Sequence, residues 1–121
     1  MDSRIYQEAC AFSCRIMKSY TYLTVEKHEF EISKQLKRSG TSIAANLAEA
    51  KYAQSRLDWI NKVSISLKEA NESHHWLELL HNSGFIDDRT YSSIIKDCNS
   101  LVYKLSSMIR TAKLNLSNNC K

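Results

Sequence analysis

Apolar residues recur at steps of three and four along four long segments of the sequence, a spacing that places them on one face of an α-helix. Proline is absent, and the 121 residues include only two glycines, so few positions interrupt a helix. The clearest series is in the last segment: Tyr91, Ile94, Ile95, Cys98, Leu101, Val102, Leu105, Met108, Ile109 and Ala112. The pattern predicts one all-α domain over residues 1–121, with helices at about 3–22, 25–51, 55–82 and 88–116.

Residues that favour helix ends lie between these segments. Thr24 is suited to cap the second helix, and Ser55 with Asp58 forms a relative of the capping box at the start of the third. Gly84 suits the left-handed position after the third helix, and Asp87 can cap the fourth. Because the connections are short, consecutive helices should be antiparallel, which predicts an up-down-up-down four-helix bundle.

The centre of the second helix, residues 39–45, is rich in small side chains. A glycine inside a helix costs about 1 kcal/mol relative to alanine, so Gly40 suggests that another backbone approaches closely there. Gly40, Ala44 and Ala48 are four residues apart and should form a smooth ridge on one side of the helix.

Two groups of side chains have the chemistry of metal ligands, but neither has the required spacing. The first group consists of Cys10, Cys14, His74, His75 and His81. It lacks the closely spaced pairs of cysteine and histidine that are typical of zinc sites. The second is a single Glu-x-x-His motif, Glu72 to His75, whereas a di-iron bundle requires two. We therefore expect free thiols and predict no metal and no cofactor.

The sequence has no pattern typical of an active site. It contains no glycine-rich phosphate loop, no Gly-x-Ser-x-Gly and no His-Glu-x-x-His. We predict that the protein is not an enzyme and has no small-molecule substrate. No run of about eighteen apolar residues and no apolar signal core at the start occur, so we expect a cytoplasmic protein that does not associate with membranes.

The net charge is +4, and no Asp or Glu occurs from Asn99 to Lys121. Six basic side chains are candidates for contacts with nucleic-acid phosphates: Lys27, Lys34, Lys37, Arg38, Arg110 and Lys113. The first four should lie near one side of the second helix, and the last two are three residues apart on the fourth. A solvated helix face would show the same pattern, so both interpretations stay open.

Two stretches contain sequence patterns that are more specific than helical periodicity alone. Residues 34–50 read KQLKRSGTSIAANLAEA, and residues 66–80 read SLKEANESHHWLELL. They resemble the signatures Q-L-x-R-S-G-T-S-I-G-A-N-I-A-E-A and A-L-K-E-A-x-E-T-x-Y-W-L-x-L-L of the bacterial four-helix-bundle family first noticed in intervening sequences of 23S rRNA genes. The resemblance covers most of the chain. Ala44 and His75 depart from it, because the family usually has glycine or proline at the first position and commonly tyrosine at the second.

The resemblance implies a bundle that assembles as a ring-shaped homopentamer. A subset of the family serves as the accessory variability protein of diversity-generating retroelements, a basic barrel that binds a reverse transcriptase and nucleic acid. Within the first signature, the residues expected to serve packing or hydrogen bonding between helices or subunits are Ser39, Gly40, Ser42, Ala45 and Asn46.

Two functions from different classes follow. The first is a non-enzymatic oligomeric scaffold that binds RNA or DNA, and a reverse transcriptase, through basic surfaces. The second is a structural or protein-interaction oligomer with no nucleic-acid role. Self-association also has a physical basis, because apolar side chains of the first helix exceed one buried stripe: Tyr6, Cys10, Met17 and Tyr22.

Overall fold

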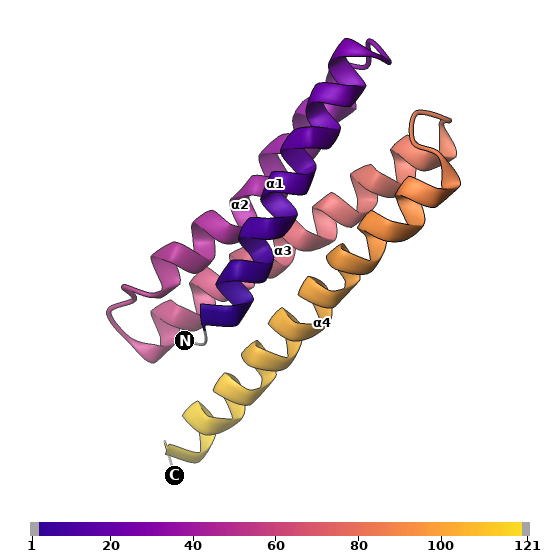
Figure 1. Ribbon diagram of the computed structural model, residues 1–121. Coiled ribbons are helices and arrows are strands. Elements are labelled where there is room, and N and C mark those ends of the chain that lie inside the picture. Colours follow the sequence, from indigo (N-terminus) through magenta and orange to yellow (C-terminus); the bar gives the residue numbers. More distant parts are fainter. Residues whose placement is uncertain (1–2, 120–121) are drawn as a thin grey trace.

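The computed structural model describes residues 3–119, which form four helices: α1 (Ser3–Val25), α2 (Glu31–Ala50), α3 (Arg56–Asn82) and α4 (Asp88–Asn119). Consecutive helices run in opposite directions, so the start of α1 and the end of α4 lie toward the same end of the molecule (Figure 1). Each helix packs against the next, and α1 also meets α4. The predicted all-α, antiparallel four-helix bundle is confirmed.

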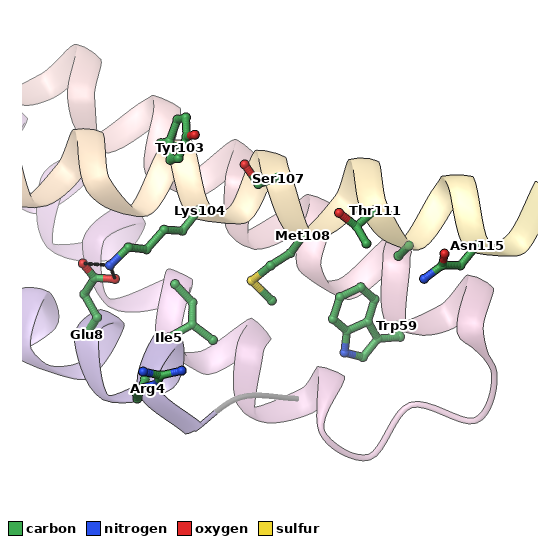
Figure 2. A pocket seen from close by; sticks show the side chains of 11 residues that line it. Arg4, Ile5, Glu8, Trp59, Tyr103, Lys104, Ser107, Met108, Thr111 and Asn115 are labelled. Carbon is green, nitrogen blue, oxygen red and sulfur yellow. Dashed lines mark hydrogen bonds and ion pairs between the residues drawn. The ribbon is translucent and has the colours of Figure 1, made fainter.

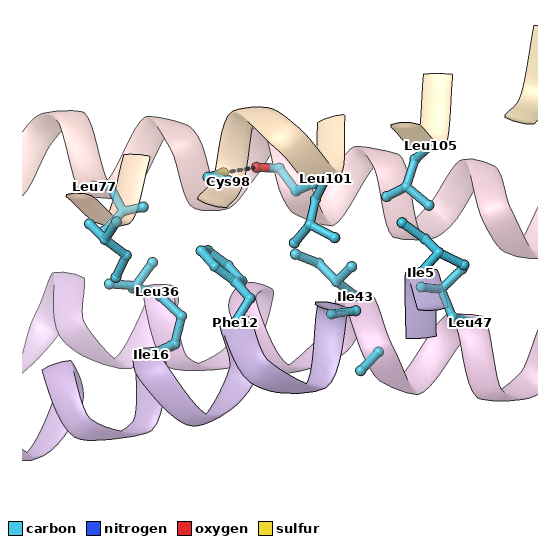
Figure 3. Packing of buried hydrophobic residues seen from close by; sticks show 14 of the residues in the cluster. Ile5, Phe12, Ile16, Leu36, Ile43, Leu47, Leu77, Cys98, Leu101 and Leu105 are labelled. Atoms are coloured by element: carbon cyan, nitrogen blue, oxygen red, sulfur yellow. Dashed lines mark hydrogen bonds between the residues drawn. The ribbon is translucent and has the colours of Figure 1, made fainter. Parts of the chain in front are cut away.

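The core is built from the apolar faces of all four helices (Figure 3). Phe12 and Ile16 of α1, Leu36 and Ile43 of α2, and Leu77 of α3 are at most 2% exposed. A side chain of this size contributes about 1.5–3 kcal/mol when it is fully buried. The α4 series is confirmed, since its inner members are buried and the others pack against the core; the buried members are Ile94, Cys98, Leu101, Leu105 and Ile109.

Three predicted helix ends are confirmed. Ser55 Oγ accepts a hydrogen bond from Asp58 N at 3.0 Å, which caps α3. Gly84, two residues after α3 ends, has a φ of +84° in the left-handed region that favours glycine. Asp87 Oδ1 accepts from Thr90 N at 2.7 Å at the start of α4, and this hydrogen bond lowers the pKa of Asp87.

The predicted start of the second helix, at residue 25, is wrong. α1 continues to Val25, and Thr24 lies inside it, where its hydroxyl donates to the carbonyl oxygen of Tyr20 at 2.9 Å. Thr24 is therefore not a cap. Because Ser and Thr hydroxyls can bond to the carbonyl four residues earlier, a Thr-rich stretch need not end a helix.

The carboxylate of Glu29 instead caps α2. Its two oxygens accept from Ile32 N at 3.1 Å and from Ser33 N at 2.7 Å, satisfying amide groups that have no partner within the helix. The turn before it places His28 at a φ of 54°, a left-handed conformation that few residues other than glycine adopt.

Gly40 allows α1 and α2 to approach closely. A Cβ at this position would lie 2.8 Å from Ile16 Cγ1, closer than two carbon atoms can pack. Ser13 Oγ of α1 also donates to the Gly40 carbonyl oxygen at 3.2 Å. The close approach predicted from the cost of a glycine within a helix is confirmed, but the nearest group is the Ile16 side chain and not a backbone.

The seam between α1 and α4 is the sparsest of the four, and polar side chains bridge it. Arg15 Nη1 lies 2.7 Å from Asp97 Oδ2, and Glu8 accepts from Ser100 Oγ at 2.7 Å and from Lys104 Nζ at 3.2 Å. α4 also ends at Asn119 rather than near the predicted residue 116, so its last turns extend past the start of α1 (Figure 1).

Candidate nucleic-acid interface

The structure places in different surroundings the four basic residues that were predicted to share one side of the second helix. Lys27 is not on α2 but in the turn before it, 5.9 Å from the centre of the Tyr22 ring, so its predicted place on that helix is wrong. Lys34 is exposed, and Lys37 Nζ lies 4.2 Å from the centre of the Tyr20 ring of α1. Only Lys34 and Lys37 remain as a basic pair on this face.

Arg38 is held by two carboxylates of α3. Its Nη1 lies 3.0 Å from Glu69 Oε2, and its Nη2 lies 2.5 Å from Glu72 Oε1. The hydrogen bond to Glu72 raises the pKa of Arg38, and the same bond holds the pKa of Glu72 below its ordinary value. Because these two carboxylates compensate its charge, Arg38 chiefly joins α2 to α3 and is a weaker candidate for a phosphate contact.

Arg110 and Lys113 occupy a different environment. Both are exposed on α4, and within residues 3–119 neither forms an ion pair. They lie in the part of the chain that has no Asp or Glu after residue 98. Their positive charges are therefore available to a ligand.

Tyr103 is an exposed aromatic residue of α4 that was not predicted from the sequence to be part of the site. It is 72% exposed and lies seven residues before Arg110, on the same face of α4. An exposed aromatic ring two helical turns, or about 10 Å, along the helix from a cationic side chain offers a surface on which a nucleobase can stack. The sequence could have indicated Tyr103, because it lies outside the series of buried residues of the same helix.

The signature residues of α2 differ in the contacts that they make. Ser39 Oγ lies 2.8 Å from Ser73 Oγ of α3, and both hydroxyls are buried. Ser42 donates to the carbonyl oxygen of Arg38 at 2.6 Å, and Asn46 Nδ2 donates to that of Ser42 at 2.8 Å. The latter two bonds lie within α2, so Asn46 does not reach a neighbouring helix.

Ala45 is the exception in this group. It is exposed, and the buried small residue beside it is Ala44. The helical spacing from Gly40 and Leu36 directs Ala44, not Ala45, toward α1, so Ala45 lies at the surface of the single chain and its role at a subunit contact stays a prediction.

The chain has four cysteines, and the three that the structure describes are not gathered in one place with the other candidate metal ligands. Cys98 is buried, Cys10 half-buried and Cys14 exposed, and burial raises the pKa of Cys98 to about 12. His81 Nε2 lies 2.7 Å from Asp88 Oδ1 and its ring stacks on Tyr91, joining the ends of α3 and α4. Among residues 3–119, no three His, Cys, Asp or Glu side chains are placed to hold a metal ion. Cys120 lies outside the described residues.

The described helices include none that is long and apolar enough to span a membrane. The fold defines a small four-helix-bundle protein whose polar side chains join neighbouring helices, bond within their own helix or lie at the surface.

Comparison with known proteins places the chain within that class. It belongs to the family of the 23S rRNA-intervening sequence protein, whose model matches residues 1–107. It is similar to a protein of unknown function from the S23 ribosomal protein family of Bacteroides thetaiotaomicron, known from a crystal structure. The two share 47% identity with a TM-score of 0.86, over 87% of this chain and 97% of that one. No curated protein matches the chain.

Proposed function

We propose that this protein is a non-enzymatic oligomeric scaffold that contacts nucleic-acid phosphates through exposed basic side chains of α4 and α2. The observation that carries the proposal is the pair Arg110 and Lys113, exposed and without ion pairs in a stretch that has no acidic residue. Positive charges in such a setting attract phosphates at low salt and release counterions on binding. Lys34 and Lys37 of α2 add a second basic pair.

Binding of this kind would be independent of sequence. Contacts to phosphates position a protein on nucleic acid but do not read the bases, and the basic residues here accompany no groove-reading motif. Tyr103 adds a ring for stacking, which favours single strands, because their bases are accessible.

Self-association would strengthen the field that attracts nucleic acid. Tyr6 and Met17, which are 38% and 44% exposed, and the half-buried Cys10 lie on the side of α1 that borders α2. An apolar strip of this kind favours contact with another copy of the chain. A pentamer, the assembly that the family resemblance implies, would carry five times the charge of +4, or +20.

The same apolar strip favours a second candidate function, a protein-interaction oligomer without a nucleic-acid role. Under this alternative the basic residues of α4 form a solvated face, and the partner is a protein. A reverse transcriptase is the partner that the family resemblance implies.

The two candidates are separated by titrating the protein with a single-stranded RNA and a duplex DNA of unrelated sequences while its mass is measured by light scattering. The proposal predicts particles of several times 13.9 kDa that bind both nucleic acids at low salt and release them as salt increases. An oligomer that binds neither at low salt would favour the protein-interaction function. If the protein is strictly monomeric, the charges of several chains do not add up, and that part of the proposal fails.

A further inference from the structure

A groove of about 790 Å³ lies where α1, α3 and α4 meet (Figure 2). Its floor is apolar and comes from three helices: Ile5 of α1, Trp59 of α3, and Met108 and Ala112 of α4. Met108 and Ile5 point toward each other, and Trp59 lies beneath the stretch of α4 that carries Thr111 and Asn115. Pockets of about 300–1,000 Å³ with a mostly apolar lining and a few polar groups are typical of small-ligand sites, so the groove has the size of such a site.

The groove follows from the unequal lengths of the helices. α4 has 32 residues and α1 has 23, so α4 continues past the first turn of α1 and faces Trp59 there without a helix of this chain between them (Figure 2). The groove is therefore open along α4 from Tyr103 to Asn115, about 18 Å or three helical turns.

Uncharged polar groups follow the α4 edge of the groove at steps of four residues: Tyr103, Ser107, Thr111 and Asn115. Four residues are slightly more than one helical turn, so the row winds around α4. Tyr103 and Ser107 lie on the outer side of the helix, and Thr111 and Asn115 lie on the side of Trp59 (Figure 2). Within residues 3–119 none of the four side chains forms a hydrogen bond with another group of the chain. Their hydroxyl and amide groups are therefore available to a ligand.

The outer side of this edge carries a cation. Arg110 is exposed and lies three residues after Ser107, a spacing that makes two side chains neighbours on a helix surface. The sequence has no Asp or Glu after residue 98, so no acid of this stretch repels a phosphate. Among the described residues that line the groove, Glu8 is the single acid, and both of its carboxylate oxygens lie 3.2 Å from Lys104 Nζ. A phosphate can thus lie at Arg110 while an uncharged group enters the groove.

We propose that this groove receives an unpaired base of a single-stranded nucleic acid. A nucleobase is flat and uncharged, and hydrogen bonds to its edge and stacking on aromatic side chains are the usual means of its recognition. The base would lie over Met108 beside Trp59 and bond to Thr111 and Asn115, and its phosphate would lie at Arg110. The inference rests on the nucleic-acid function proposed above and adds a preference for single strands, because a base paired in a duplex cannot turn into the groove.

The test compares two short, dye-labelled RNA strands with the same number of phosphates, one with all its bases and the other with abasic residues. Affinity is measured at low salt by fluorescence anisotropy, and the emission of Trp59 is read in a Trp76→Phe protein, because Trp76 does not line the groove. We expect the strand with bases to quench Trp59 and to bind at least about fivefold more tightly than the abasic strand.

The outcomes separate the two proposals. Equal affinity of the two strands, or binding of the strand with bases without a change at Trp59, would overturn a base in the groove and leave the phosphate contacts standing. If neither strand binds at low salt, both proposals fail.

A matched pair of variants on α4 locates the site. Asn115→Leu removes the amide at the groove with little change in side-chain size, and Asn118→Leu makes the same change at an exposed position outside it. We expect the first to weaken the strand with bases about fivefold without affecting the abasic strand, and the second to change either affinity less than about twofold. Thr111→Val replaces Asn115→Leu if that variant loses helicity by circular dichroism. Equal effects of the inside and outside variants contradict the assignment.

A second copy of the chain is the competing occupant. In that case the strand with bases would not quench Trp59, and Asn115→Leu would change the mass of the particle in light scattering but not its affinity for RNA. That outcome rejects a base in the groove but leaves the phosphate contacts standing, because these are measured on Arg110 and Lys113.

Discussion

Arg38 Nη1 on α2 lies 3.0 Å from Glu69 Oε2 on α3, and the Glu69 side chain is only 11% exposed. The second guanidinium nitrogen binds Glu72, which is 28% exposed. A nearly buried carboxylate needs a compensating charge, so Arg38 has a structural task that its place in a row of basic residues does not reveal.

Replacing Arg38 with alanine should therefore destabilise the fold. The change leaves Glu69 without its cation, and we expect a loss of about 1–3 kcal/mol in the free energy of unfolding, measured by urea denaturation. Lys34→Ala, on the same helix and exposed without an ion pair in the described chain, should change stability by less than about 0.5 kcal/mol. Equal effects of the two substitutions would show that the Arg38 pair contributes nothing.

The Arg38–Glu72 pair also predicts how stability depends on pH. The pKa of Glu72 is lowered in the folded protein, chiefly by the hydrogen bond from Arg38. The folded state thus holds this proton less tightly than the unfolded chain does, so the stabilisation is present above the ordinary pKa of glutamate and is lost as pH falls through the lowered value. Glu72→Gln should show a smaller loss of stability below about pH 5 than the parent in thermal melts at several pH values. If Glu72→Gln loses as much stability below about pH 5 as the parent does, this prediction is contradicted.

Gly40→Leu should destabilise the protein by about 1–3 kcal/mol, because α1 leaves no room for a side chain. Even the first carbon would meet Ile16 Cγ1 at 2.8 Å. The matched control is Ala45→Leu, an added side chain of similar size at an exposed position five residues further along α2. A melting temperature of Gly40→Leu equal to that of the parent would show that α1 and α2 are further apart than described.

The buried thiol of Cys98 should be unreactive in the folded protein. Burial raises its pKa to about 12, and its Sγ donates to the carbonyl oxygen of Ala70 at 3.3 Å, so almost no thiolate forms near neutral pH. Treatment with a thiol reagent followed by peptide mass spectrometry should label the exposed Cys14 rapidly and Cys98 only in denaturant. Similar labelling rates of the two cysteines in the native protein would contradict the burial of Cys98.

The fold was largely predictable because each helix has its own apolar series. The spacing from Tyr91 to Ala112 predicted α4, and Gly84 and Asp87 marked the boundary between α3 and α4 through their local conformational preferences. The turn before α2 was missed for an equally local reason. A glutamate side chain caps the helix there, although glutamate is rarely the capping residue, and Thr24 bonds within α1.

The candidate site was less predictable, because side chains cross between helices. Helical spacing gives the direction in which Arg38 leaves α2 but not the acids of α3 that its long side chain reaches. The groove at Trp59 depends on how far α4 extends past the start of α1, an offset that no pattern within a single helix encodes.

The most direct measurement is the salt dependence of RNA binding by two charge-reversed proteins. Arg110→Glu with Lys113→Glu removes the proposed contacts, whereas Arg89→Glu with Lys96→Glu changes the net charge equally at other exposed positions of α4. We predict that the first variant binds single-stranded RNA more weakly and that its slope of log affinity against log salt falls by about 1.4, or 0.7 for each lost phosphate contact. The second variant should keep the slope of the parent. Equal losses in the two variants, or unchanged binding by the first in a correctly folded protein, would contradict a nucleic-acid interface at Arg110 and Lys113.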